Sequence, residues 1–403
     1  MHLLIVADGR SPIARNWITG ELSLGHRVSL VSTYPCSALP GVTDLIVMPV
    51  AFGGMAGGGQ GGRRSGFRQV VGRFRPVFQA GRSLLGPLLL LGSRRRFARL
   101  AAALQPDLVH ALRIPYEGML ASLTPAGLPF VVSVWGNDLT LHAPESALLG
   151  RLTRQTLRRA DGLLADAQRD LHLAQQWGFD PARPARVIPG GGGVDLAEIR
   201  VLAELGQAAA AFDFPPEAPL IINPRGIRAY ARADTFFQAI PLVLQRWPSA
   251  HFLCPGMAGQ PEALRWMSSL KLDDRVHLLP VLPQAQLWGL FLRAMATVSL
   301  TSHDGTPNTL IEAMACGCLP VAGDVAALRE WITPGVNGLL VDPDNPQSLA
   351  EALVLALNNP PLRKRAAEIN LDLVTRRAEL QYSRAQMQVF YQQLVAAATT
   401  PGV

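Results

Sequence analysis

The chain has 403 residues, of which 49% are hydrophobic and 17% are charged, and its formal net charge is +7. This length predicts two domains that each bury a core, and the apolar fraction excludes a disordered chain. The positive charge favours acidic partners: nucleotide phosphates, an anionic lipid surface or nucleic acid.

Apolar segments of strand length alternate with helical spans through the first half of the chain. The first strand is expected at 3–7, followed by a helix from about residue 13 to 24. The N-terminal apolar run is too short for a signal peptide, and no later run reaches the ~20 residues of a membrane span, so a cytoplasmic protein is expected. Further strands are expected at 27–32, 45–50, 107–112, 130–136, 161–167 and 185–190.

The stretch from 51 to 104 departs from this alternation. A Gly-rich segment over 53–62 is followed by ten arginines between Arg63 and Arg99, with the apolar run 84–91 among them. Arginines beside exposed leucines are typical of a membrane-surface segment. The alternative is a solvated basic face whose leucines turn to the core. Nucleic acid is a weaker third option, because aromatic residues that could stack on bases are sparse here.

The alternation restarts after an Ala- and Pro-rich stretch at 205–219, which predicts a linker. Strands are expected at 220–226, 251–256, 276–280, 296–300, 318–322 and 338–341, and a last helix from about 379 to 397. Repeated strand and helix predict the α/β class with doubly wound sheets. We therefore expect an N-terminal domain over 1–205, a second over 206–378, and a C-terminal helical segment over 379–403.

The segment 301–323 carries the strongest chemical pattern. It predicts a loop after a strand and then a helix, with Thr306 as cap, Pro307 at the first helical position and Gly317 as the stop. Free amides at Asn308, Thr309 and Leu310 would form an anion site. Glu312 lies one turn further on the same face. This arrangement suits a nucleotide, with phosphate on the amides and ribose hydroxyls on Glu312; the alternative is a solvated carboxylate on an amphipathic helix.

The same residues resemble the donor-site signature of retaining, nucleotide-sugar-dependent glycosyltransferases of family 4, which have the GT-B fold. That signature has two acidic residues eight positions apart, here Asp304 and Glu312, followed by the run 313–321, AMACGCLPV. The later segment 335–341, GVNGLLV, also matches. The first acid of the family is usually Glu, so Asp304 keeps the charge but is one methylene shorter.

The resemblance implies two Rossmann-like domains facing across a cleft, with the last helix packed on the first domain. It implies an Arg for the donor diphosphate, which matches Arg225, and a Lys, whose position falls on Tyr230. Arg228 or Arg232 would then supply the missing charge, since a guanidinium binds phosphate with two hydrogen bonds; the alternative is that both are surface charges.

Several polar residues are expected at strand ends of the first domain. Asp138 follows the strand at 130–136 and would orient the sugar or acceptor, and His110 matches a His-containing family segment. His142 is a weaker candidate. For His110 the alternative is a local structural hydrogen bond. Gly9 stands for the family's glycine pair in the loop after the first strand.

No metal is expected. Cys36, Cys254, Cys316 and Cys318 do not form a disulfide or zinc pattern, and we expect them to be small buried residues in a reducing compartment. The segment 342–344, DPD, is similar to the metal-binding motif of another glycosyltransferase fold, but turn chemistry explains it. A nucleotide-diphosphate sugar is the expected co-substrate, with no cofactor.

The implied reaction is transfer of a sugar, with retention, to a hydroxyl of a glycan or lipid-linked acceptor. Asp304 would hold the transferred sugar, and no nucleophile–base pair is evident because the leaving phosphate takes the acceptor's proton. The alternatives are a sugar-nucleotide epimerase with the same donor pocket, or an inactive nucleotide-sugar-binding subunit. The expected partners include a possible anionic membrane surface but no nucleic acid, so the protein would be cytoplasmic or peripheral at the inner face of the membrane.

Overall fold

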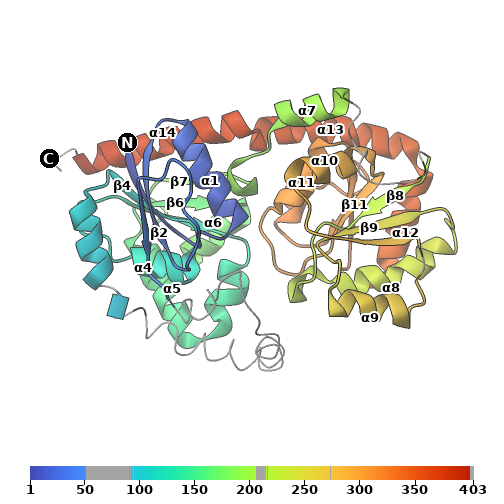
Figure 1. The fold of residues 1–403 in the computed structure, drawn as a ribbon, viewed down its shortest axis with the longest axis horizontal. Helices are drawn as coiled ribbons and strands as arrows, with labels where there is room; N and C mark the ends of the chain where they lie inside the picture. The colour runs from blue at the N-terminus through green and yellow to red at the C-terminus, as the bar shows by residue number, and fades with distance from the viewer. Residues whose placement is uncertain are drawn as a thin grey trace. The chain divides into compact units, whose positions relative to one another are not determined.

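A computed structural model of the chain describes residues 1–50, 90, 92–93, 95–205, 215, 217–272 and 274–399. It contains two compact units (Figure 1): Met1–Gly192 together with the residues from Arg384 onward, and Gly193–Ser383. The division falls before the expected boundary at residue 205. It lies in a glycine run where Gly191, Gly192 and Gly193 have φ of 60°, 109° and 110°, a region that favours glycine.

The first unit is built on a parallel sheet of seven strands among the described residues, in the order β3-β2-β1-β4-β5-β6-β7. The strands are β1 (His2–Ala7), β2 (Arg27–Ser32), β3 (Asp44–Val47), β4 (Leu108–Ala111), β5 (Phe130–Val134), β6 (Gly162–Ala165) and β7 (Ala185–Val187). Most of their residues are buried because helices cover both faces, which explains their continuous apolar runs.

The helices of this unit are α1 (Pro12–Ser23), α4 (Met119–Ala121), α5 (Ala147–Arg159) and α6 (Gln168–Gln176), with a further helix over 95–104. The last helix of the chain, α14 (Leu380–Thr399), contributes its residues from Arg384 on. Met387, Phe390 and Leu394 of α14 pack with Trp17 and Ile18 of α1 on one face of the sheet. Figure 1 shows α14, in red, running beside α1.

The second unit repeats the arrangement with a parallel sheet of six strands among the described residues, in the order β10-β9-β8-β11-β12-β13. The strands are β8 (Leu220–Ile222), β9 (His251–Pro255), β10 (Val276–Leu279), β11 (Ala296–Ser299), β12 (Leu319–Gly323) and β13 (Leu339–Val341). The helices are α7 (Leu196–Glu204), α8 (Ala233–Leu244), α9 (Pro261–Ser269), α10 (Gln284–Arg293), α11 (Asn308–Ala315), α12 (Pro346–Asn358) and α13 (Pro360–Ala378).

Both sheets confirm the predicted doubly wound architecture, and each expected strand is found. In each sheet the strand order reverses beside the first strand, between β1 and β4 and between β8 and β11. The loops that leave these neighbouring strands diverge to opposite faces, which opens a crevice at their carboxyl ends. Functional groups are therefore expected at residues 8–11 and 112–117 of the first unit, and at 223–226 and 300–308 of the second.

Among the described residues, no helix combines the length and apolar character that crossing a membrane requires. Of the arginines predicted to form a membrane-surface segment, Arg95, Arg96 and Arg99 are exposed on the helix over 95–104. The remaining arginines, the Gly-rich segment and most of the leucine run lie outside the described residues, as does most of the predicted linker.

Candidate active site

An ion pair joins the ends of β8 and β11 in the second unit. The Arg225 guanidinium, which follows β8, donates a hydrogen bond to the Asp304 carboxylate, which follows β11. The Arg225 side chain is 9% exposed and that of Asp304 is 19% exposed. Asn223, which is buried, accepts from the backbone N–H of Arg225 at 3.2 Å and fixes the turn. The sequence pattern identified both charges but not their pairing.

Arg225 retains hydrogen-bonding capacity at this strand edge. Its Nε–H is buried and has no acceptor in the part of the chain that the structure describes. The Thr309 hydroxyl, in the first turn of α11, is likewise buried without a partner there. A buried polar group that lacks a partner costs free energy, about 1–3 kcal/mol each, so these groups are suited to a polar ligand.

Glu312 lies inside α11 and is only 8% exposed, so it is not a solvated carboxylate on an amphipathic helix. The side-chain amide of Gln284, at the start of α10, donates to its Oε1 at 3.1 Å. Burial raises the pKa of Glu312 above its ordinary value, and the hydrogen bond from Gln284 partly offsets this effect. Hydrogen bonds donated by ligand hydroxyls would stabilise the ionised form of Glu312.

The start of α11 differs from the prediction by one residue. Pro307 is the cap, in extended conformation, and the helix begins at Asn308. Thr306 does not cap it, because its hydroxyl accepts from the Trp331 indole N–H at 3.0 Å. The Leu310 N–H is also not free, since it donates to the Pro307 carbonyl at 3.0 Å. Within the described chain, the amides of Asn308 and Thr309 remain available for an anion.

The two further arginines do not join the Arg225–Asp304 pair. Arg228 is exposed and donates to the Tyr230 hydroxyl at 3.1 Å. Arg232, which has a positive φ of 40°, pairs with Asp234 at 3.0 Å and with Asp344. Arg232 is therefore neutralised by two carboxylates, of which Asp344 is too distant in the sequence to be revealed by spacing. The Asp342 carboxylate accepts from the Asp344 N–H at 2.9 Å, which fits the expected turn.

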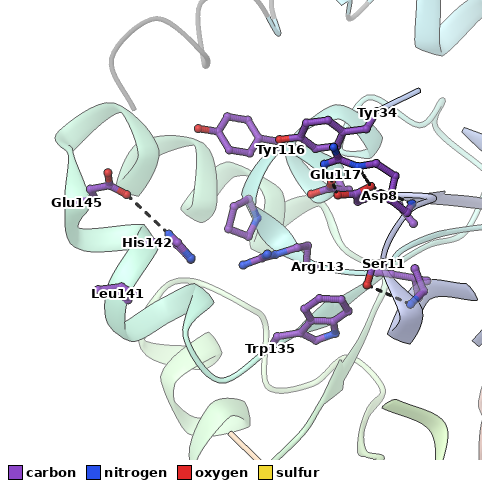
Figure 2. Close-up of a pocket in the computed structure, with 15 residues that line it drawn as sticks. Asp8, Ser11, Tyr34, Arg113, Tyr116, Glu117, Trp135, Leu141, His142 and Glu145 are labelled. Carbon is purple, nitrogen blue, oxygen red and sulfur yellow. Dashed lines mark hydrogen bonds and ion pairs between the residues drawn. The ribbon is translucent and has the colours of Figure 1, made fainter. Parts of the chain in front are cut away.

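The first unit contains a cavity of about 610 Å³ at the crevice between β1 and β4. Figure 2 shows side chains from several loops gathered around it, with Tyr34 and Tyr116 on one side and Trp135 on another. The chain kinks at this point, because Pro115 and Tyr116 have non-helical angles and Tyr116 has a φ of 67°. Strained backbone of this kind often occurs at functional sites. The lining residues are Ala7, Asp8, Arg10, Ser11, Ala14, Tyr34, Leu112, Arg113, Pro115, Tyr116, Glu117, Trp135, Leu141, His142 and Glu145.

The charged groups of this cavity are closely paired. Arg10 binds both oxygens of Asp8, at 3.0 and 2.9 Å, and its guanidinium lies 3.6 Å above the Tyr34 ring. Glu117 is buried and accepts from the Thr33 hydroxyl at 2.6 Å. Burial raises the pKa of Glu117, although Arg113 and Thr33 act in the opposite direction.

Asp138 has a supporting position instead of lining the cavity. It is fully buried, and its carboxylate accepts from the Arg113 guanidinium at 2.7 Å and from the Ile114 and Trp135 amides at 3.1 and 3.2 Å. These bonds hold the cavity residues Arg113 and Trp135. The predicted direct role in orienting the sugar therefore changes to a positioning role.

His110 is buried in the middle of β4, and the geometry gives no support to its predicted catalytic role. One ring nitrogen lies 2.7 Å from the Tyr391 hydroxyl of α14 and the other 2.8 Å from the Ser133 hydroxyl. Burial lowers the pKa of His110 to about 3, so the ring is neutral. Of the expected histidines, His142 is the one that lines the cavity.

Gly9 has a steric reason to be glycine. Its N–H donates to the Ser32 hydroxyl at 3.1 Å, and an added Cβ would lie 2.5 Å from the Cys36 sulfur. The loop after β1 can therefore turn tightly over β2, which places its neighbours Asp8 and Arg10 at the cavity.

Sequence reasoning missed Arg10, Arg113, Glu117 and Gln284. The first three follow β1 and β4, the neighbouring strands at which the sheet order reverses. The strand-end rule that pointed to Asp138 could have found them, had the order of the strands been known. Gln284 lies at the start of a helix far from Glu312 in the sequence, and no local signal marks it.

Two family models match the chain. Residues 9–191 match the "Glycosyl transferase 4-like domain" and residues 208–371 match "Glycosyl transferases group 1". Curated relatives include D-inositol 3-phosphate glycosyltransferases of Thermomonospora curvata, 28% identical over 240 residues, and Kribbella flavida, 30% identical over 241 residues. Each match covers 56% of this chain and 55% of the relative, so the chain spans about half the length of these relatives.

Solved structures share the fold over almost the whole chain. HepE of Anabaena, in complex with UDP, has a TM-score of 0.71 and 15% identity, and the match covers 98% of this chain and 100% of HepE. Sucrose-phosphate synthase of Thermosynechococcus elongatus has a TM-score of 0.69 and 17% identity, with 98% and 99% covered. At these identities the likeness establishes the architecture alone.

Proposed function

Because the chain belongs to the glycosyl transferases group 1 family, we propose that it transfers a sugar, with retention, from a nucleotide-diphosphate sugar to an acceptor hydroxyl. The observation that carries this proposal is the buried carboxyl of Glu312, set one turn beyond two available amides and close in sequence to Asp304. HepE, which shares the fold, has been solved with UDP and with UDP-glucose. A uridine nucleotide is therefore the first donor to test.

Each group of the second unit has a chemical part in this proposal. The Asn308 and Thr309 amides and the Arg225 guanidinium bind the donor diphosphate. Glu312 accepts hydrogen bonds from the ribose hydroxyls. Asp304, held by Arg225, faces the hydroxyls of the transferred sugar. These groups are fixed before the reaction, so they stabilise developing charge without reorganisation.

The proposed transfer can be written with the donor and the acceptor alone, without a cofactor. The bond between the sugar C1 and the diphosphate oxygen breaks, and its electron pair leaves with the diphosphate. A bond forms between C1 and the acceptor oxygen on the same face, and the acceptor's proton passes to the departing phosphate oxygen. Positive charge on the ring and negative charge on the phosphate peak together, and we assign Asp304 to the first charge and its ion-pair partner Arg225 to the second.

The acceptor carries a free hydroxyl and is either a glycan or lipid-linked. A lipid-linked acceptor would agree with peripheral attachment to an anionic membrane, for which the arginine-rich segment between residues 63 and 99 is the supporting feature.

The test of the donor site is Glu312→Ala, with UDP, GDP and ADP titrated by calorimetry. Losing the hydrogen bonds to the ribose weakens binding of the preferred nucleotide by about 1.5–3 kcal/mol, which is at least tenfold. The matched control is Glu351→Ala, an exposed carboxylate on α12. Equal affinity of Glu312→Ala and wild type would contradict the proposal.

Product analysis separates the transferase from its alternatives. Nucleotide release that depends on an added acceptor identifies a transferase. Interconversion of two sugar nucleotides without an acceptor identifies an epimerase, and donor binding without turnover identifies an inactive subunit.

A further inference from the structure

The cavity of the first unit brings its cations together with an excess of carboxyl groups. The two guanidiniums are those of Arg10 and Arg113, and each is paired: Arg10 with both oxygens of Asp8, and Arg113 with the buried Asp138 at 2.7 Å. Among the described residues of the lining, no further lysine or arginine is present. A phosphate group that entered this cavity would compete with Asp8 for Arg10 and would meet in Arg113 a guanidinium whose charge is already balanced by Asp138.

The remaining titratable groups of the cavity add carboxyl groups but no further cation. Glu117 and Glu145 also line the cavity, so three carboxyl groups of the lining, those of Asp8, Glu117 and Glu145, accompany two guanidiniums, and Asp138 pairs with Arg113 from behind the lining. His142 lies 3.7 Å from Glu145 (Figure 2), and burial lowers its pKa below the ordinary value, so it is neutral at pH 7. The described residues that line the cavity therefore carry no net positive charge, although the chain as a whole is basic.

The polar and aromatic groups suit a ring with many hydroxyls. Carboxylates accept hydrogen bonds from hydroxyls, and the Arg113 guanidinium donates to them. The rings of Tyr34, Tyr116 and Trp135 provide flat apolar surface for the C–H faces of such a ring. The volume of about 610 Å³ is within the range of small-molecule sites.

We propose that this cavity binds an acceptor whose recognised part is an uncharged, polyhydroxylated ring, and that its paired arginines exclude phosphorylated acceptors. The inference rests on the proposed function, since it names the acceptor class of that reaction. Selectivity comes from repulsion: a phosphate meets carboxylates that already neutralise both cations, whereas a neutral sugar loses no charge pairing on entry. The curated relatives are named for a phosphorylated acceptor, and this cavity points to a different class.

Binding of matched pairs tests the proposal directly. Glucose, mannose, galactose, N-acetylglucosamine and myo-inositol are each titrated against the full-length protein beside the corresponding monophosphate, without nucleotide. We expect at least one neutral compound to bind at least tenfold more tightly than its phosphate. Tighter binding of a phosphate in the best pair, or no binding of any neutral member, overturns the proposal. A separate UDP titration reports on the donor site, so failure of the proposed function is recognised independently.

Substitution of the counter-ion gives a second, independent result. Asp8→Asn keeps an oxygen to accept from the Arg10 backbone N–H, which now donates at 3.0 Å, but it removes the charge that neutralises the guanidinium. We expect the monophosphates to bind at least tenfold more tightly to Asp8→Asn than to wild type. The control Asp372→Asn breaks an exposed Arg–Asp pair on α13 and should change neither series. An Asp8→Asn variant that is folded by circular dichroism but gains no phosphate binding contradicts the proposal.

Discussion

The Asp304 carboxylate is held by hydrogen bonds within the protein and is also assigned to the sugar in the proposed reaction. It accepts a hydrogen bond from Arg225 and also contacts the backbone N–H of Gly305 at 3.1 Å, so its carboxylate is held close to the main chain. In the proposed reaction it faces the sugar, where positive charge develops only in the transition state. Its contribution should therefore appear mainly in the rate of the chemical step.

We expect Asp304→Asn to lower kcat at least tenfold while the Kd for UDP changes less than threefold. Steady-state kinetics and calorimetry measure the two quantities. The companion Asp304→Glu tests reach, because a longer carboxylate keeps the charge but changes its distance from Arg225. A near-normal kcat for Asp304→Asn would place this residue outside the chemistry.

The burial of His110 predicts how the free energy of unfolding depends on pH. Its folded pKa is lowered to about 3, below the ordinary value of 6.5. The unfolded chain therefore binds the proton first as pH falls, and the folded state loses up to about 1.4 kcal/mol per pH unit below about pH 6.5.

Urea unfolding of wild type and His110→Asn at pH 7.0, 6.0 and 5.0 measures this effect. The variant is less stable at pH 7.0, since Tyr391 and Ser133 lose a partner, but its free energy of unfolding should fall less steeply toward pH 5.0. Parallel slopes would show that His110 is not buried in its neutral form.

At the scale of the elements, the packing of α14 on the first sheet depends on a glycine. Gly162, at the start of β6, faces this helix, and an added Cβ would lie 2.7 Å from Leu394 Cδ1 and 2.8 Å from Phe390 Cζ. Gly20 of α1 has its nearest such neighbour at 3.5 Å, an ordinary contact.

We expect Gly162→Ala to destabilise the protein by about 1–3 kcal/mol through overpacking. Gly20→Ala should be neutral or stabilising by up to about 1 kcal/mol, because alanine favours a helix. Thermal or urea unfolding compares the two. If both variants unfolded like wild type, α14 would not be packed tightly on β6.

The elements were predictable where a local signal exists. Strand positions followed from buried apolar runs such as 27–32, which matches β2 residue for residue, and Gly317 ends α11 with a φ of 85°. The predicted start of α11 differs by one residue, because Thr306 is the better cap by residue type and the Trp331 contact that occupies its hydroxyl is distant in the sequence. Likewise, nothing near Arg232 revealed that Asp344 would neutralise it.

At the scale of the whole molecule, the positive charge is unevenly distributed. Among the described residues that line the cavity of the first unit, cations do not exceed carboxyl groups, whereas the sequence has ten arginines between residues 63 and 99. Each basic residue close to an anionic membrane contributes about 1 kcal/mol, screened by salt.

Co-sedimentation with vesicles tests this proposal of peripheral attachment. We expect binding to vesicles that contain phosphatidylserine at low salt, release at high salt, and no binding to phosphatidylcholine alone. Replacing Arg95, Arg96 and Arg99 by Gln should weaken binding, whereas Arg265→Gln with Arg376→Gln, on α9 and α13, should not. Absence of binding under every condition would favour an acceptor that is not in a membrane.

The return of the chain to its first unit has a consequence for biosynthesis. Tyr391 and Leu394, which complete the core around Trp17, are translated after the whole second unit has been made. At about 5–20 residues per second, the interval between Gly192 and Arg384 lasts roughly 10–40 s. During that time the nascent first sheet exposes the apolar face that α14 will cover. The second unit has all its residues when the ribosome passes Ser383, so it can mature first, and a chaperone that shields the waiting face would raise the yield of folded protein.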